Sequence, residues 1–318
     1  MDHRIAVTSG EVFDYIRQYA AQKGLEAEKI TIRENTREEF ERKVKGYPAI
    51  LAGGEFYNEE ILKALSGPLK IITRFGVGYD QIDCESAKKY KIAVANTPGS
   101  NSAGVADQAI MMMLALGRSV CRYDTQTRRN CWEKSEIVTH ELEGKTVGLI
   151  GFGHIARILR RYLSGFGCRV LVMDDYVKDD ILEKYDVQRA DLPTLARESD
   201  FISLHVPITP STRGMIDKEF LKLMKPTAYL INTCRGGVVK EGDLIWGLRE
   251  GQLAGAGLDV LEQEPSAPDN PLFRMEQVIL SPHVSFNTQE SNERTARMAV
   301  DEICEYLTSG HCAHIVNG

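Results

Sequence analysis

Short apolar runs alternate with longer amphipathic stretches along the first hundred residues, which indicates strands and helices in turn. The amphipathic stretches 11–24 and 59–67 each close on a glycine, a residue that commonly ends a helix. Because strands that alternate with helices form parallel sheets covered by those helices, we expect a first α/β domain here. Its strands are predicted at residues 4–7, 29–32, 48–52, 69–73 and 91–97.

A second series of the same kind begins after the turn-rich segment NTPGSNS at 96–102. The apolar stretch 103–124 comes first and is expected to form one long helix that packs between the two units. An amphipathic stretch at 288–310 predicts a closing helix. The strands between them are predicted at 145–150, 168–174, 200–206, 228–233, 253–260 and 277–281. A chain of 318 residues with two such series is expected to form two domains.

Composition narrows the classes of protein that fit. The formal net charge of −6 argues against nucleic acid or an anionic membrane surface as the main partner. The apolar run 109–116 is too short to span a bilayer, and the N-terminus does not resemble a signal peptide. Seven scattered cysteines without a CxxC pair indicate a reducing cytoplasm. His311, Cys312 and His314 are interpreted as loose tail residues, so no metal site is expected.

A glycine-rich turn follows the strand predicted at 145–150. Gly151 permits a tight turn, Gly153 allows a pyrophosphate to approach the backbone, and Ala156 allows close helix packing. The amides of His154 and Ile155 are expected to point from the helix N-terminus at the phosphates. Strand, turn and helix in this order predict a dinucleotide-binding site.

The next strand ends on an acidic residue, Asp174, roughly 20 residues after the glycine turn. A carboxylate at this position accepts hydrogen bonds from the adenosine ribose hydroxyls and repels a 2′-phosphate. The sequence therefore predicts NAD rather than NADP as cofactor. Asp175 is the alternative for the same role.

Further charged residues follow the last three strands of the second series: Arg235, then Asp259 and Glu264, then His283. Because the carboxyl ends of parallel strands meet at one edge of the sheet, these groups could converge. Arginine holds a carboxylate with two parallel donors, histidine transfers protons near neutral pH, and a carboxylate stabilises the charged imidazole. A buried Arg235–Glu264 ion pair with a structural histidine fits the pattern about equally well.

The chain resembles the D-2-hydroxyacid dehydrogenases over nearly its whole length. Several separate motifs carry the resemblance, in the order in which the family has them. They are RFGVGYDQID (74–83), NTPGSNSAGVAD (96–107), GLIGFGHIA (148–156), LHVPITPSTRGMI (204–216), INTCRGGVVKEGDLIWGL (231–248), AGAGLDVLEQEP (254–265) and SPHVSFNT (281–288).

The resemblance assigns a role to each of the three charged residues. It implies that Arg235 binds the substrate carboxylate, that His283 is the general acid and base, and that Glu264 pairs with this histidine. Glu262 is rejected because the family's glutamate directly precedes a proline. We expect His283 to donate a proton to the ketone oxygen as hydride from NADH reaches C2.

The resemblance also implies further binding residues. Asp259 is expected to face the nicotinamide carboxamide. Cys234 is expected to border the nicotinamide as a small packing residue rather than a reactive thiol. Arg235 and His283 are expected to border the cofactor as well. The remaining expected cofactor contacts are His205, Val206, Pro207, Thr212 and Thr233, and the expected substrate contacts in the first domain are Val77, Gly78 and Asn101.

The family's layout implies two doubly wound parallel-sheet domains, with a Rossmann NAD domain inserted into a flavodoxin-like substrate domain. Residues 100–285 would form the NAD domain, and residues 1–99 and 286–318 the substrate domain, with substrate in the cleft between them. The long helix after residue 102 would double as a homodimer surface.

The function implied is NAD-dependent hydride transfer between nicotinamide and C2 of a small D-2-hydroxy or 2-oxo acid. Glyoxylate or hydroxypyruvate is favoured over 3-phosphoglycerate, because phosphoglycerate dehydrogenases carry an arginine in the loop that here reads LAGGEFYNEE (51–60). A different class also fits, since some relatives are NAD-sensing co-repressors.

Overall fold

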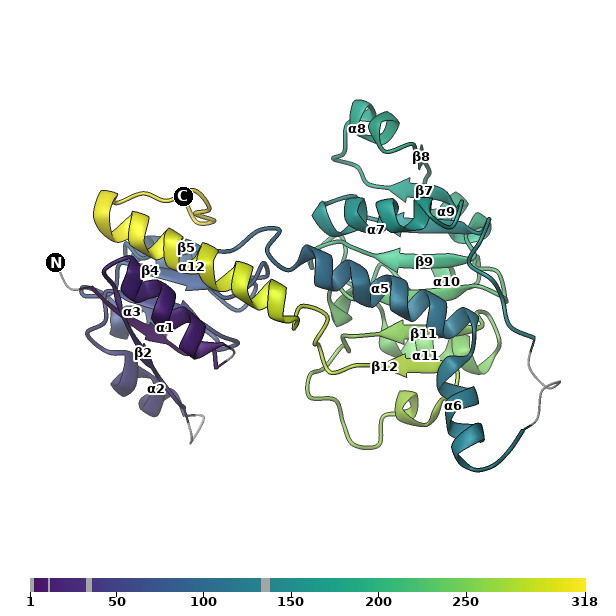
Figure 1. Cartoon of the computed structure of the whole chain (residues 1–318), viewed down its shortest axis with the longest axis horizontal. Coiled ribbons are helices and arrows are strands. Elements are labelled where there is room, and N and C mark those ends of the chain that lie inside the picture. Colours follow the sequence, from purple (N-terminus) through teal and green to yellow (C-terminus); the bar gives the residue numbers. More distant parts are fainter. Residues whose placement is uncertain (1–2, 11, 33–35, 133–137) are drawn as a thin grey trace. The chain divides into compact units, whose positions relative to one another are not determined.

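The computed structural model describes residues 3–10, 12–32, 36–132 and 138–318. The chain divides into two compact units. Unit 1 combines Met1–Asn101 with Asn287–Gly318, and unit 2 is Ser102–Phe286. Each unit is a parallel sheet with helices on both faces (Figure 1).

Unit 1 has five parallel strands in the order β2-β1-β3-β4-β5. The strands are β1 (Arg4–Val7), β2 (Glu26–Lys29), β3 (Ala49–Ala52), β4 (Ile71–Arg74) and β5 (Ala93–Ala95). Helices α1 (Phe13–Gln22) and α12 (Gln289–Ser309) pack on one face of the sheet. The other face is covered by α2 (Arg37–Val44), α3 (Glu59–Leu65) and α4 (Cys84–Lys89).

The second strand was predicted at 29–32, but β2 spans Glu26–Lys29 and pairs with β1. The prediction followed the apolar letters of this stretch. Instead, the amide of Leu25 bonds the carbonyl of Ala20 (2.9 Å) at the end of α1, and the edge strand starts directly afterwards. Ile30 and Ile32 still pack against the core, although they lie outside the ladder.

Unit 2 has seven parallel strands in the order β12-β11-β10-β9-β6-β7-β8. The strands are β6 (Thr146–Ile150), β7 (Arg169–Met173), β8 (Gln188–Arg189), β9 (Phe201–Leu204), β10 (Tyr229–Asn232), β11 (Gly255–Leu258) and β12 (Val278–Leu280). One face packs against α5 (Ser102–Gly117), α7 (His154–Ser164) and α8 (Asp179–Lys184). The other packs against α9 (Leu192–Glu198), α10 (Lys218–Leu221) and α11 (Glu241–Arg249).

The single helix predicted at 103–124 is two helices, α5 and α6 (Val120–Arg128). The break falls at Ser119, which has a left-handed backbone with φ of 49°. A Cβ at Gly117, the last residue of α5, would lie 3.2 Å from the carbonyl oxygen of His140, so the two chain segments touch there. Apolar periodicity does not report such a contact between segments.

The C-terminal tail was expected to be loose, and this expectation is wrong. Ile315 forms an antiparallel bridge with Ala95 of β5, and Cys312 is buried. Nδ1 of His314 lies 2.6 Å from Oε1 of Glu302 in α12. The tail therefore covers the open edge of the unit 1 sheet, which leaves it less available for pairing with other chains.

Both sheets reverse their strand order once. The reversal falls between β1 and β3 in unit 1 and between β6 and β9 in unit 2. In open α/β sheets the carboxyl ends of strands at such a reversal form a crevice that binds ligands. Among the helices in the described ranges, none is long and apolar enough to cross a membrane.

Candidate active site

The glycine turn lies at the strand reversal of unit 2, between β6 and α7. Gly151 has φ of 90°, and a Cβ there would lie 2.6 Å from the carbonyl oxygen of His205. Gly153 is the N-cap of α7, and no atom lies within 4 Å of the position that its Cβ would take. The first glycine is therefore required by the protein's own packing, whereas the second leaves open space.

This open space fits a dinucleotide phosphate. It lies at the N-terminus of α7, a helix of 11 residues. The amides at such an end have no partner within the helix and carry a partial positive charge. A pyrophosphate next to Gly153 would accept from these amides, including those of His154 and Ile155.

Asp174 follows β7, and its carboxylate bonds both the glycine turn and the residues directly after it in the chain. Its Oδ2 accepts from the amide of Phe152 in the glycine turn (2.7 Å), and its Oδ1 accepts from the amides of Tyr176 (2.8 Å) and Val177 (3.0 Å). These bonds fix the carboxylate beside the turn. Asp175 is exposed and makes no such bond within the described residues.

Two polar side chains at the ends of β9 and β10 are unsatisfied. Both ring nitrogens of His205 and the hydroxyl of Thr233 are buried and lack partners among the described residues. Burial lowers the pKa of His205 to about 4, so its ring is neutral at pH 7. Buried polar groups without partners are costly, and a bound polar ligand would satisfy them. In contrast, the Thr212 hydroxyl is used within its own loop, where it donates to the carbonyl of Pro207 (2.6 Å).

His283 and Glu264 form a close pair at the carboxyl ends of β12 and β11. Nδ1 of His283 lies 2.7 Å from Oε2 of Glu264, whose Oε1 accepts from the amide of Leu261 (3.0 Å). Burial raises the pKa of Glu264, but the hydrogen bond and charge of His283 outweigh it, and the net pKa is lowered. Glu262 lies elsewhere, because its Oε2 accepts from the amide of Glu241 in α11.

Asp259 holds the His283 loop in place, a role that sequence reasoning missed. Its backbone carbonyl accepts from the amide of His283 (2.7 Å), which has a left-handed backbone with φ of 54°. Its carboxylate accepts from the Ser281 hydroxyl (2.5 Å) and from the amides of Val284 and Ser285 (3.0 Å each). These bonds stabilise a backbone conformation that a non-glycine residue seldom adopts.

Arg235 follows β10, and a buried asparagine that was not predicted shapes its turn. Asn232 donates through Nδ2 to the carbonyl of Arg235 (3.0 Å) and accepts through Oδ1 from the amide of Cys234 (3.1 Å). Nη1 of Arg235 donates to the carbonyl of Cys234 (2.8 Å). An asparagine at the end of a buried strand, just before a turn, is the signal that could have indicated this role.

Comparison with known proteins agrees with these features. The sequence profile of the D-isomer specific 2-hydroxyacid dehydrogenase NAD binding domain matches residues 110–285. A glyoxylate reductase from Thermococcus litoralis is 41% identical over 256 residues, covering 78% of this chain and 77% of its own. A D-3-phosphoglycerate dehydrogenase from Archaeoglobus fulgidus is 36% identical over 296 residues, covering 93% of this chain but 55% of its own.

The fold agrees as well. The structure of D-lactate dehydrogenase with NAD+ from Lactobacillus jensenii superposes with a TM-score of 0.80 at 29% identity, covering 98% of this chain and 99% of that one. The chain belongs to the D-2-hydroxyacid dehydrogenase family. It is an NAD-dependent oxidoreductase that acts on a small-molecule substrate.

The expected substrate contacts of this dehydrogenase in unit 1 lie at the carboxyl ends of β4 and β5. The carbonyl of Val77 accepts from Nδ2 of Asn96 (2.8 Å), which fixes the loop that includes Gly78. Oδ1 of Asn101 is buried and has no partner in the described part of the chain. Their role as substrate contacts stays a prediction.

Cys234 lies next to Arg235, but its surroundings do not activate it. Burial raises the pKa of the thiol to about 11, although the neighbouring backbone amides and the charge of Arg235 act in the opposite direction. Its Sγ lies 3.2 Å from Oδ1 of Asn232. A reactive thiol needs a lowered pKa, so the packing interpretation is favoured over the redox one.

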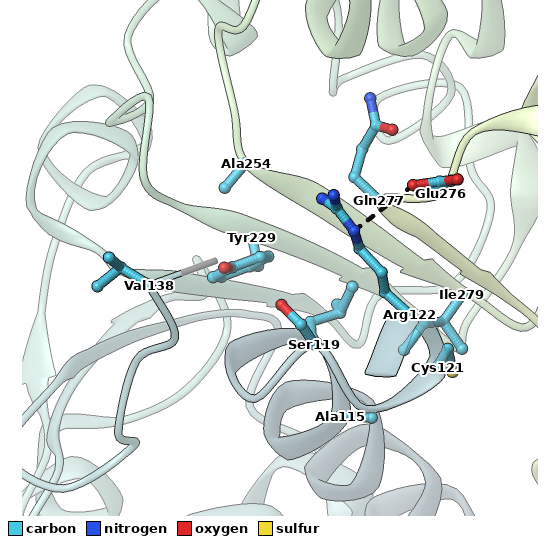
Figure 2. A pocket seen from close by; sticks show the side chains of 11 residues that line it. Ala115, Ser119, Cys121, Arg122, Val138, Tyr229, Ala254, Glu276, Gln277 and Ile279 are labelled. Atoms are coloured by element: carbon cyan, nitrogen blue, oxygen red, sulfur yellow. Dashed lines mark ion pairs between the residues drawn. The ribbon is translucent and has the colours of Figure 1, made fainter. Parts of the chain in front are cut away.

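A cavity of about 270 Å³ lies at the opposite edge of the dehydrogenase's unit 2 sheet (Figure 2). Tyr229, the first residue of β10, and Gln277, just before β12, line it together with Ser119 and Arg122. Nε of Arg122 forms an ion pair with Oε2 of Glu276 at 3.7 Å. Because the cavity is at the amino ends of the strands, it is separate from the candidate catalytic residues.

Proposed function

We propose that the protein reduces a small 2-oxo acid with NADH, with glyoxylate or hydroxypyruvate as the favoured substrate. The observation that carries this proposal is the His283–Glu264 pair at 2.7 Å, at the same sheet edge as the turn that ends in Arg235. An acid–base group on the same sheet edge as a cation suits a substrate with a ketone beside a carboxylate. Residues 100–285 would bind NAD, and residues 1–99 with 286–318 would complete the substrate site.

In this proposal each side chain has a separate task. Arg235 binds the carboxylate and orients the carbonyl carbon. Protonated His283 donates its proton to the ketone oxygen, and Glu264 stabilises the imidazolium before this transfer. Bound NADH supplies the hydride that reaches C2. The orientation of substrate and acid lowers the barrier because the reacting groups are already in place.

The remaining cofactor contacts are proposed from where their residues lie. Gly151, Gly153 and Asp174 would hold the pyrophosphate and adenosine ribose. The carboxamide end would meet the unsatisfied groups of His205 and Thr233. Val206, Pro207, Thr212, Cys234 and Asp259 would form the wall around it, and Val77, Gly78 and Asn101 would contact substrate.

Replacement of the acid tests this function. We expect His283→Ala to lower kcat for glyoxylate reduction by on the order of 10³-fold, because proton transfer contributes about 10²–10⁴-fold. NADH affinity, measured by fluorescence titration, should change little. His311→Ala, at an exposed histidine of the tail, is the matched control. Near-normal turnover by His283→Ala would show that the acid lies elsewhere.

We also propose a cytoplasmic homodimer formed through α6 and the segments beside it. Helix α6 has no buried residue, and Val120, Trp132 and Val138 are exposed nearby. A second copy would cover these side chains and the cavity of Figure 2. Light scattering should give twice the chain mass of 35.6 kDa, and the double variant Val120→Asp with Val138→Asp should give the mass of one chain.

The cytoplasmic location is proposed from the cysteines. Seven unpaired cysteines support a reducing compartment, which cell fractionation would test.

A further inference from the structure

A glutamine of α5 is bonded to the network that holds the His283 loop. Nε2 of Gln108 donates to Oγ of Ser281 (3.0 Å), and the Ser281 hydroxyl donates to Oδ1 of Asp259 (2.5 Å). The backbone carbonyl of Asp259 accepts from the amide of His283 (2.7 Å). All of these residues belong to unit 2, and they form one chain of hydrogen bonds from a helix to the proposed acid.

Close packing of α5 on β11 determines where Gln108 lies. A Cβ at Gly257 in β11 would lie 2.9 Å from Cβ of Met112, so any larger residue there would force the helix and the strand apart. Gln108 precedes Met112 by four residues, which places both side chains on the same face of α5. Gln108 is thus about one turn from the Gly257 contact, at the carboxyl ends of β11 and β12 (Figure 1).

The amide of Gln108 determines the direction of the Ser281 hydroxyl. A serine hydroxyl has one proton and can rotate, so its orientation depends on its neighbours. Nε2 of Gln108 only donates, so Oγ of Ser281 accepts on that side and its proton is left for Asp259. Asp259 is almost fully buried, and a buried carboxylate is costly unless donors surround it. Gln108 therefore favours the hydroxyl orientation that supplies this carboxylate with a side-chain donor.

The carboxylate of Asp259 matters to the acid because the loop backbone is unfavourable. His283 has φ of 54°, in a region that costs free energy for a residue with a Cβ. Asp259 stabilises this conformation from both sides, since its carboxylate bonds the amides of Val284 and Ser285 (3.0 Å each) and its carbonyl bonds His283. A carboxylate that has lost a donor would hold the loop less firmly, and the imidazole would be less well fixed on Glu264.

We propose that Gln108 is a positioning residue for the reduction and that it acts through Ser281 and Asp259 on His283. Gln108 transfers no proton itself. This inference rests on the proposed function, because it takes His283 as the acid. Loss of the Gln108 amide should slow the chemical step and leave NADH affinity unchanged.

Two substitutions interrupt the chain at successive links. Gln108→Leu removes the amide but keeps a side chain of similar size, and Ser281→Ala removes the hydroxyl. Gln18→Leu, at an exposed glutamine of α1, is the matched control. Single-turnover oxidation of bound NADH by saturating glyoxylate gives the rate, so that product release does not hide the chemical step. Fluorescence titration gives NADH affinity, and urea unfolding shows that each variant is folded.

The expected losses follow from the kind of hydrogen bond removed. Gln108→Leu should lower the rate about fivefold, because its bond is between neutral groups, and Ser281→Ala about 30-fold, because its bond is to a charged carboxylate. Gln108→Asn, whose amide is too short to reach Ser281, should lose about as much as Gln108→Leu. Gln18→Leu should stay within about twofold of wild type, and NADH affinity should stay within about twofold throughout.

Combined variants distinguish positioning from a general loss of packing. Because Gln108 acts through the hydroxyl, Gln108→Leu with Ser281→Ala should be no slower than Ser281→Ala alone. Because the chain ends at the acid, Gln108→Leu should not lower the residual rate of His283→Ala by more than about twofold. A loss of packing would instead multiply the two effects in both pairs.

The two proposals fail in different ways. If wild type reduces glyoxylate and His283→Ala is impaired, but Gln108→Leu and Gln108→Asn keep the wild-type rate within twofold, this inference is wrong. Multiplied effects in either pair overturn it as well. If wild type with bound NADH does not reduce 2-oxo acids, or if His283→Ala has near-normal rates, the proposed function fails and this inference fails with it.

Discussion

Gly236 lies where the turn after Arg235 touches the loop that holds Glu264. A methyl group at this position should therefore displace both the turn and the loop. A Cβ at Gly236 would lie 1.8 Å from the carbonyl oxygen of Leu261 and 2.6 Å from the amide nitrogen of Glu262. Both atoms belong to the backbone and cannot rotate away. To reach even 3.0 Å from that oxygen, the segments must separate by 1.2 Å, the difference between 3.0 and 1.8 Å.

This displacement sets the expected size of the effect. Forcing extra volume into a packed site costs about 1–3 kcal/mol, and we expect the upper end because backbone meets backbone. The amide of Leu261 positions Glu264 (3.0 Å), so the shift carries the carboxylate away from its histidine. A misplacement of about 1 Å costs on the order of 10²-fold in rate. Gly236→Ala should therefore lower kcat/KM about 100-fold and stability by about 3 kcal/mol.

The neighbouring glycine gives a matched control. A Cβ at Gly237 would meet only the ends of the Arg213 and Ile208 side chains, both at 3.4 Å, so Gly237→Ala should stay within about threefold of wild type. Urea unfolding gives the stability, and NADH oxidation with a 2-oxo acid gives the rate. Wild-type kcat/KM in Gly236→Ala, or equal damage in both variants, would refute the reasoning.

Three further predictions concern single side chains. Asp174→Ala should lower the NAD-to-NADP ratio of kcat/KM at least about tenfold. It should also lower the free energy of unfolding in urea by about 2 kcal/mol, because three backbone amides lose their acceptor. Asp175→Ala should have neither effect. Glu264→Gln should lower kcat for reduction, measured by NADH oxidation, because the imidazolium loses its neighbouring charge. The lowered pKa of Glu264 also stabilises the folded protein above the pKa of an unfolded glutamate, about 4.3, and this stability is lost as the pH falls through the lower pKa of the folded state. Glu264→Gln should therefore make the free energy of unfolding depend less on pH on the acid side. Cys234 should react with iodoacetamide at pH 7.5 far more slowly than the exposed cysteines, as measured by mass spectrometry, because its pKa is raised to about 11.

The fold was predictable where local signals determine it. The core strands are apolar throughout and the helices between them are amphipathic, so both parallel sheets could be predicted from the pattern. β2 could not be placed correctly, because an edge strand with the sequence EAEK is defined by its pairing with β1. The break at Ser119 and the docking of the tail on β5 also depend on contacts between distant segments.

The candidate site also has a part that could be predicted from the sequence and a part that could not. The glycine turn, Asp174 and the order Arg235, Glu264, His283 are readable because each follows a strand whose carboxyl end must lie at one sheet edge. The distance of 2.7 Å between Glu264 and His283 is a finding of the structure. Sequence reasoning could not anticipate that the carboxylate of Asp259 bonds the loop around His283, since those partners are not adjacent to it in the chain.

Each proposed catalytic residue of unit 2 is held by a hydrogen bond that involves the backbone, either from its own strand end and loop or from a neighbouring strand end. Asn232 bonds the carbonyl of Arg235, the Leu261 amide bonds Glu264, and Asp259 bonds the amide of His283. Charges that stabilise a transition state act most strongly when they are fixed in advance, because the protein then does not reorganise during the reaction. Such fixation accounts for polar residues that are almost fully buried at a sheet edge without any direct role in proton transfer. It also explains why a cation is tolerated at the end of an apolar strand: Asn232 satisfies the backbone of its turn, and Nη1 of Arg235 donates to the carbonyl of Cys234.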